Sequence, residues 1–308
     1  MALIAVAQPS YIKLLTLIGF YIALGQAVNI FTGLTGYLNF GFAALLAMGA
    51  YGLGVTIAYY PGLGPAVVPL GIMLGMAMSA AVAAAIGAVA LRLRGAYFAI
   101  ATIGVNQAIR YFIEGTGIWG GGSGLIFGVE AFKALGRDTA IALANIGSAL
   151  LIISAGLAAA LVTYFIAVSK VGYALAAVRQ DEDAAKAMGV NPTSYKLLAF
   201  VVSAAISGFL GAVYYPMSQL HVFPQDVFDI GIILGGLAVV FVGGVGTATG
   251  PVVGGLIYAG LSYLIGLYLP GYQSLAAAFL ILLFQVFLPR GIVGELIYRR
   301  PELYRYIV

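Results

Sequence analysis

Long stretches of this sequence contain no aspartate, glutamate, lysine or arginine. They cover residues 14–91, 139–169, 197–225 and 230–289. Each exceeds the roughly 20 apolar residues with which a helix crosses a hydrocarbon core about 30 Å thick. A transmembrane β-barrel would instead show short strands of alternating polarity. The pattern therefore predicts an all-α membrane protein, a polytopic bundle of transmembrane helices.

Turn signals divide these stretches into about nine spans. Pro61-Gly62-Leu63-Gly64-Pro65 and Pro270-Gly271 are the clearest of these signals. Broken or re-entrant segments would change the count to eight or ten. The whole chain, 1–308, is then a single transmembrane domain. The expected spans are 12–33, 38–60, 66–91, 95–113, 139–168, 197–216, 229–247, 250–269 and 272–289.

Composition agrees with this pattern and indicates how the protein is oriented in the membrane. Hydrophobic residues make up 63% of the chain and charged residues 8%, whereas a soluble domain carries about a quarter charged residues. The net charge of +4 indicates cytoplasmic loops, where basic residues gather, and we expect no nucleic-acid partner. The C-terminus is predicted to be cytoplasmic and the N-terminus external. The cytoplasmic basic residues are Arg92, Arg94, Lys170, Arg179, Lys186, Lys196, Arg290, Arg299, Arg300 and Arg305.

Residues that could carry chemistry are few. The chain has no cysteine and one histidine, His221, so neither a metal site nor a cofactor of its own is expected, and no enzyme activity. No phosphate-binding GxxxxGK[ST] pattern occurs. Arg110 and Glu114 can pair on one helix face. Ion-coupled transporters use carboxylates within the membrane. Carboxylates are scarce in the predicted spans of this chain, which argues against a secondary transporter or channel acting alone.

Two glycine-rich stretches interrupt the helices, at 33–41 and 243–251. Irregular backbone in a membrane is tolerated where protein or a water-filled cavity satisfies it, and paired interruptions point to a transport pathway. Simple cytoplasmic turns between spans explain the glycines equally well. Four polar residues within spans are expected to form interhelical hydrogen bonds rather than line a pore. They are Gln26, Asn29, Asn106 and Gln107.

The cytoplasmic connection between the fifth and sixth spans predicts a short helix of about two turns. Acidic residues at 181–183 suit a helix N-terminus, and Glu182 can pair with Lys186. Gly189 would end the helix. Such a concentration of charge in a protein so poor in charge indicates a docking surface, although an ordinary solvated loop is the alternative. The apolar face would carry Leu175, Val178, Ala185 and Met188.

This segment resembles the cytoplasmic loop of permease subunits in ABC importers, especially the branched-chain amino acid (Liv-type) class. It reads GYALAAVRQDEDAAKAMGVN at 172–191. Further stretches resemble the same family in the same order: GYLNFG at 36–41, LRLRGAYFAI at 91–100, GGVGT at 243–247 and LPRG at 288–291. The stretch at 91–100 resembles the M-type rather than the H-type subunit.

The resemblance implies a permease subunit of the prokaryotic inner membrane. Its partners would be the lipid bilayer, a second permease, cytoplasmic ATPase subunits that hold ATP and Mg²⁺, and an external solute-binding protein. The cargo would be leucine, isoleucine or valine, with urea or short amides as the alternative. A purely structural membrane subunit is a further alternative, disfavoured by the paired breaks.

The resemblance also gives two sets of candidate residues. Segment 172–191 would be the coupling helix that docks on the ATPase. The docking residues are expected to be Arg179, Asp181, Glu182, Ala185, Lys186, Met188 and Gly189. The translocation pathway is expected to involve Gly36, Tyr37, Asn39, Tyr97, Asn106, Gly244 and Gly246.

Overall fold

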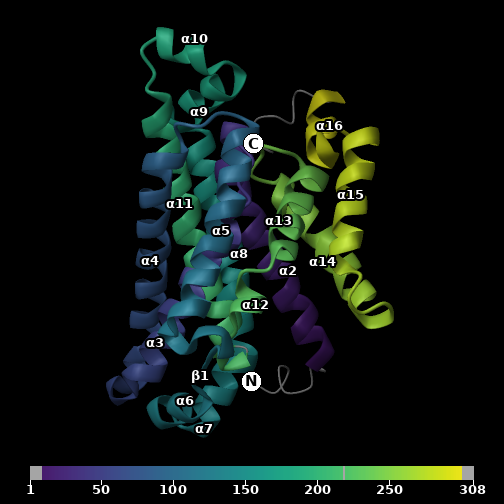
Figure 1. Ribbon diagram of the computed structural model, residues 1–308. Helices are drawn as coiled ribbons and strands as arrows, with labels where there is room; N and C mark the ends of the chain where they lie inside the picture. The colour runs from purple at the N-terminus through teal and green to yellow at the C-terminus, as the bar shows by residue number, and fades with distance from the viewer. Residues whose placement is uncertain (1–8, 218, 300–308) are drawn as a thin grey trace.

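Helices occupy all nine predicted span positions. The computed structural model describes residues 9–217 and 219–299, and in this part of the chain the long helices lie side by side (Figure 1). They are α2 (Pro9–Val28) with its continuation η1 (Asn29–Gly33), α3 (Phe42–Tyr59), α4 (Val67–Ala90), α5 (Ala96–Thr116), α8 (Ser148–Ala167), α11 (Pro192–Ala212), α13 (Ile230–Gly243), α14 (Gly250–Tyr268) and α15 (Gln273–Phe287).

Seven helical stretches of the described residues are long and apolar enough to cross a membrane. The two remaining predicted spans differ for separate reasons. α5 contains Arg110 and Glu114 and is the least apolar of the long helices, and α15 has 15 residues. The all-α polytopic fold is confirmed, with seven spans by length and composition and with α5 and α15 alongside them.

Shorter elements gather at the two ends of the bundle. One end carries α6, α7 and a two-stranded ladder, in which Leu125 pairs with Val222 and so joins the connection after α5 to the connection after α11. The opposite end carries α9, α10 and α16 (Figure 1). At the first end lie η2 (Pro61–Ala66), η3 (Ile118–Ser123), β1 (Leu125–Ile126), α6 (Gly128–Leu135), α7 (Arg137–Ala142), η4 (Leu143–Gly147), η5 (Val213–Met217), β2 (His221–Val222) and α12 (Pro224–Val227); at the second lie α9 (Lys170–Gln180), α10 (Glu182–Ala187) and α16 (Gly291–Arg299).

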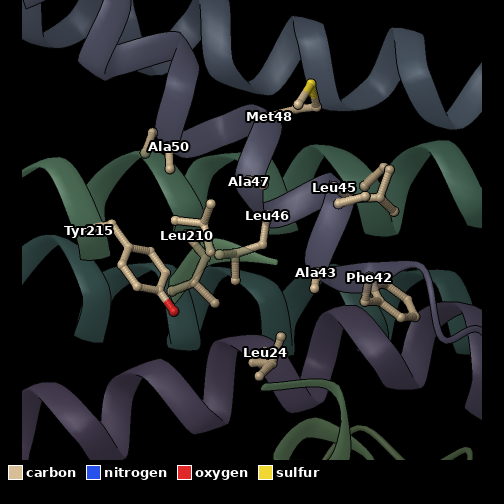
Figure 2. Close-up of a cluster of buried hydrophobic side chains, with 14 of the residues drawn as sticks. Leu24, Phe42, Ala43, Leu45, Leu46, Ala47, Met48, Ala50, Leu210 and Tyr215 are labelled. Atoms are coloured by element: carbon tan, nitrogen blue, oxygen red, sulfur yellow. The ribbon is translucent and has the colours of Figure 1, made fainter. Parts of the chain in front are cut away.

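Helix α3 lies at the centre of the core. Figure 2 shows its side chains between α2 and α11, with Leu24 and Leu210 pointing toward it. Leu45 and Leu46 are completely buried. Helix α3 packs mainly against α4 and α11, so its position fixes the centre of this part of the bundle.

Glycine permits the closest of these contacts. A Cβ atom on Gly52 of α3 would collide with the backbone of Gly75 in α4, and one on Gly49 would collide with the backbone of Gly208 in α11. Small residues let helix backbones approach within a membrane, where lipid provides no hydrophobic drive for association. The alanine- and glycine-rich spans thus pack backbone to backbone.

Candidate functional site

The segment predicted to dock, 172–191, contains most of α9 and all of α10, and its sequence stabilises both ends of α10. Asp181 caps the N-terminus, where its Oδ1 accepts hydrogen bonds from the backbone N–H groups of Asp183 (2.9 Å) and Ala184 (3.0 Å). Gly189 adopts a positive φ of 87° just after the helix, a conformation that glycine reaches without steric cost. Pro192 then begins α11. Such local signals explain why the helix is only six residues long.

Glu182 connects α10 to the body of the bundle. Its Oε2 accepts a hydrogen bond from the hydroxyl of Tyr37, and its Oε1 lies 2.9 Å from Nζ of Lys196. The prediction that Glu182 pairs with Lys186 is wrong, because the carboxylate points toward α11 and Lys196 occupies that place. The sequence predicts that Lys196 is one of the basic residues of a cytoplasmic loop, whereas its side chain is 0% exposed.

Tyr37 completes this contact from the first glycine-rich break. Nζ of Lys196 lies 4.3 Å from the centre of the Tyr37 ring and 3.3 Å from its hydroxyl. A cation over an aromatic face is stabilised by the ring quadrupole, more strongly when water is excluded. The buried ammonium thus has both a carboxylate and a ring as partners. We call Tyr37, Glu182 and Lys196 the α10 anchor.

A second, exposed ion pair joins α10 to the connection between α4 and α5. Both terminal nitrogens of Arg94 donate to the two carboxylate oxygens of Asp183, each at 2.8 Å. Both side chains are more than half exposed, so this bidentate pair contributes little stability. Its geometry still orients α10 relative to α5.

The anchor shifts the pKa values of its titratable groups. Burial raises the pKa of Glu182, but the hydrogen bonds from Tyr37 and Lys196 and the charges of Lys196 and Arg94 outweigh it and hold this pKa below its ordinary value. Burial and the hydrogen bond to Glu182 raise the pKa of Tyr37 above its ordinary value. The Arg94 guanidinium lowers the pKa of Asp183. At neutral pH Glu182 is therefore charged and Tyr37 is the hydrogen-bond donor.

The two glycine-rich breaks lie against each other at this same end of the bundle. Oδ1 of Asn29 accepts a hydrogen bond from the N–H of Gly246 (2.8 Å), and its Nδ2 donates to the carbonyl of Thr247 (2.9 Å). Gln26 donates to the carbonyl of Ala248 at 2.6 Å. The breaks are thus paired connections at the ends of their spans rather than interruptions halfway along them. Asn29 and Gln26 therefore bond to the backbone of the second break, which is not helical, rather than between helices as predicted.

Arg179 of α9 joins the docking segment to both breaks. Its Nη1 donates to the carbonyl of Gly33 at 2.6 Å. A Cβ placed on Gly246 would lie 2.7 Å from the same nitrogen. Burial lowers the pKa of Arg179. The α9–α10 segment therefore contacts the first break twice, through Gly33 and through Tyr37.

The predicted docking residues divide into two groups. Arg179 and Glu182 bond to the bundle through Gly33 and Lys196, although the Arg179 side chain stays partly exposed, and Ala185 is 5% exposed. A direct contact of the Ala185 side chain with a partner, as expected of a docking residue, does not fit this burial. Met188 is 86% exposed. The outward group comprises Asp181, Lys186, Met188 and Gly189.

The structure brings together only part of the predicted pathway set. Gly36, Tyr37, Gly244 and Gly246 lie at the breaks. Asn39 is buried, and its Oδ1 accepts a hydrogen bond from the N–H of Gly41 at 2.7 Å. The other two residues, Tyr97 and Asn106, lie on α5, which contacts the first break through a hydrogen bond from the N–H of Phe40 to Thr102.

Helix α5 carries the remaining predicted pathway residues. Asn106 is buried and donates to the carbonyl of Phe228 at 3.2 Å. Tyr97 is 75% exposed on a stripe that continues through Gly104, Ala108 and Tyr111. The predicted pair of Arg110 and Glu114 is confirmed, with a separation of 2.9 Å. Among the described residues, no three histidine, aspartate or glutamate side chains gather as a metal site would require.

Comparison with known proteins agrees with this architecture. The family described as "Branched-chain amino acid transport system / permease component" matches residues 10–288. Two curated relatives, from Salmonella typhimurium and Escherichia coli, are both named "High-affinity branched-chain amino acid transport system permease protein LivM". Each is 30% identical, over 271 and 272 residues respectively, and the match covers 76% of this chain and 61% of the relative. The chain thus spans about three fifths of the length of these relatives. No solved structure matches significantly.

Proposed function

This chain belongs to the family of branched-chain amino acid transport permeases, and from that membership we propose that it is a transmembrane subunit of an ATP-driven importer. The cargo we propose is leucine, isoleucine or valine. ATP and Mg²⁺ would be held by separate cytoplasmic ATPase subunits, so that this chain moves the cargo without carrying out the hydrolysis.

The observation that carries this proposal is the attachment of α10 to the first break. A helix of six residues is too short to be stable alone, because helix nucleation is costly, and here the α10 anchor holds it. Tyr37 joins α10 to residues 36–41, and Arg179 joins α9 to Gly33. A displacement of α10 would therefore act on the connection between the first two spans. Rigid-body gating of the bundle is the expected consequence.

The outward surface of α10 is the proposed contact with the ATPase. Met188 supplies an exposed apolar side chain, and Asp181 and Lys186 surround it with charge. An apolar centre with a charged rim is the usual anatomy of a protein interface. We infer that this end is cytoplasmic, since Lys186 lies on α10, Arg290 directly precedes α16, and Arg92 belongs to the connection between α4 and α5. The C-terminal helix α16 would then be cytoplasmic in a multi-pass inner-membrane protein.

The exposed stripe of α5 is the proposed contact with a second permease subunit and the wall of the route between them. α5 is the least apolar long helix, and open space surrounds Gly104. Polar positions within a membrane face the bundle interior or a water-filled cavity rather than lipid. Tyr97 and the breaks would then contribute to the translocation route. The end with α6, α7 and the β1–β2 ladder would receive the external solute-binding protein.

Reconstituted transport tests the proposal. The chain would be incorporated into liposomes alone, and again with its permease, ATPase and solute-binding partners, and uptake of labelled leucine would be measured with and without ATP. ATP-dependent uptake only by the complete set supports the importer. Uptake by the chain alone down a gradient would instead identify an autonomous transporter. Uptake of urea but not leucine would identify urea as the cargo.

A further inference from the structure

A cavity of about 630 Å³ lies between the two breaks and helix α16. Its polar wall contains two arginines, Arg179 and Arg290, together with Thr32. Cavities of about 300–1,000 Å³ are the usual size of small-molecule sites. Its lining residues include Arg179 of α9 and Gly294 and Ile297 of α16, so it lies at the end of the bundle that carries these helices.

Thr32 is the first sign that this cavity receives a ligand. Its side chain is 3% exposed, and its hydroxyl is buried without a hydrogen-bond partner among the described residues. A buried hydroxyl without a partner costs about 1–3 kcal/mol. An acceptor bound in the cavity would remove this cost.

The positive charge of the cavity is the second sign. In the part of the chain that the structure describes, no acidic side chain forms an ion pair with Arg179 or Arg290. The four ion pairs found there involve Arg94, Arg110, Lys196 and Arg299. Arg179 uses one donor on Gly33, and Arg290 stacks on the ring of Tyr298 at 3.7 Å. A guanidinium has five N–H donors, so both arginines retain donors for an anion.

The remaining wall is apolar apart from Thr247, whose hydroxyl is bonded to the backbone of Gly244 and Gly250. It includes Leu38, Phe241, Val245 and Ile297. No aspartate or glutamate lines the cavity, so nothing there is built to bind an ammonium group. The combination fits a ligand with an oxyanion at one end and an aliphatic group at the other.

We propose that this cavity binds an aliphatic carboxylate, with the carboxylate at Arg290, Arg179 and the Thr32 hydroxyl and the side chain against Phe241 and Val245. This inference rests on the proposed function, because the carboxylate of a branched-chain amino acid is the cargo group that the site recognises at the cytoplasmic end of the route. Recognition is by carboxylate and side chain only. The corresponding 2-oxo acid should therefore bind as well as the amino acid.

The test uses the permease complex without its solute-binding protein, in phosphatidylcholine nanodiscs. Binding of L-leucine, 4-methyl-2-oxopentanoate and L-leucinamide would be measured by calorimetry. We expect the first two to bind and leucinamide, which lacks the carboxylate, to fail. Arg290→Gln should weaken binding about tenfold or more, since a hydrogen-bonded charge is lost, and Thr32→Val several-fold. Arg299→Gln, which removes an exposed arginine of α16 that does not line the cavity, should change nothing.

Three results would overturn the inference. They are equal binding of leucinamide, an unchanged affinity in Arg290→Gln, and loss of carboxylate binding when phosphatidylglycerol replaces part of the phosphatidylcholine. The last result would assign the site to a lipid headgroup. Leucine uptake measured beside these assays separates the two proposals. If leucine is taken up but does not bind in the cavity, the proposed binding site is wrong and the proposed function stands. If binding depends on Arg290 but leucine is not taken up, the proposed cargo is wrong and the binding site stands.

Discussion

The ammonium of Lys196 lies 2.9 Å from a carboxylate oxygen of Glu182 and is completely buried, with the face of Tyr37 on another side. The three residues come from α11, α10 and the first glycine-rich break. Burying two charges is favourable only when each keeps its partners. The pair therefore favours one position of α10, and several measurable consequences depend on it.

Removing the ammonium should release α10. In Lys196→Met the carboxylate of Glu182 loses its buried partner, and breaking a buried pair in this way costs about 3–5 kcal/mol. We expect faster hydrogen exchange at residues 181–190 and a lower thermal transition of the purified protein. Arg94→Met removes the exposed pair with Asp183 and should cost about 0–1 kcal/mol. Equal effects of the two variants would mean that burial does not decide the strength of the anchor.

Acidification should loosen the same contact. The pKa of Glu182 is held below its ordinary value, so its contribution to stability is fully present above that ordinary value. The contribution is lost as the pH falls through the lowered pKa. Below a pH of about 4.3, the ordinary pKa of glutamate, the thermal transition of the wild-type protein should fall progressively. Glu182→Gln should already be less stable at pH 7 and should show a flatter dependence. Parallel profiles for the two proteins would assign the acid sensitivity to other groups.

The contact between the breaks should be sensitive to a single methyl group. Gly246 has a φ of 83°, and a Cβ there would lie 2.7 Å from Arg179 and 3.2 Å from the carbonyl of Gly33. Gly246→Ala should therefore cost at least the roughly 1–2 kcal/mol of a left-handed backbone, and uptake should fall sharply while membrane insertion continues. Gly260→Ala is the matched control, because it lies within α14 with open space around it. Normal uptake by Gly246→Ala would show that transport does not require the close contact between the two breaks.

Much of the fold was predictable because its signals are local. Charge-free length predicts the spans, and Asp181 and Gly189 mark the ends of α10 by capping. The partners of α10 were not predictable, since nothing within one helix indicates that Glu182 will choose Lys196 over Lys186, its neighbour one turn away. The burial of Ala185 likewise depends on how α9 folds back. The hydrogen bonds of Asn29 join residues more than 200 positions apart. The periodicity of a sequence predicts local elements and does not indicate contacts over such a separation.

Orientation can be tested by labelling, since the chain contains no cysteine. Ala176 on α9 and Ile126 on β1 are both exposed and lie at opposite ends of the bundle. In intact cells an impermeant thiol reagent should label Ile126→Cys and leave Ala176→Cys unmodified until the cells are opened. The reverse pattern would place the basic end of the protein outside, against the positive-inside rule.

The proposed docking role of α10 makes the sharpest prediction for Met188. This side chain is 86% exposed, so we expect a change there to act on a partner rather than on the stability of the chain. A charged residue at an apolar interface centre is left desolvated and unpaired. Met188→Glu should therefore reduce co-purification of the ATPase at least tenfold and abolish ATP-driven uptake, with an unchanged thermal transition. Ile126→Glu introduces the same charge at an exposed apolar position on the opposite end and should leave the ATPase bound. If Met188→Glu retains both the ATPase and uptake, α10 is not the element that couples this chain to ATP hydrolysis.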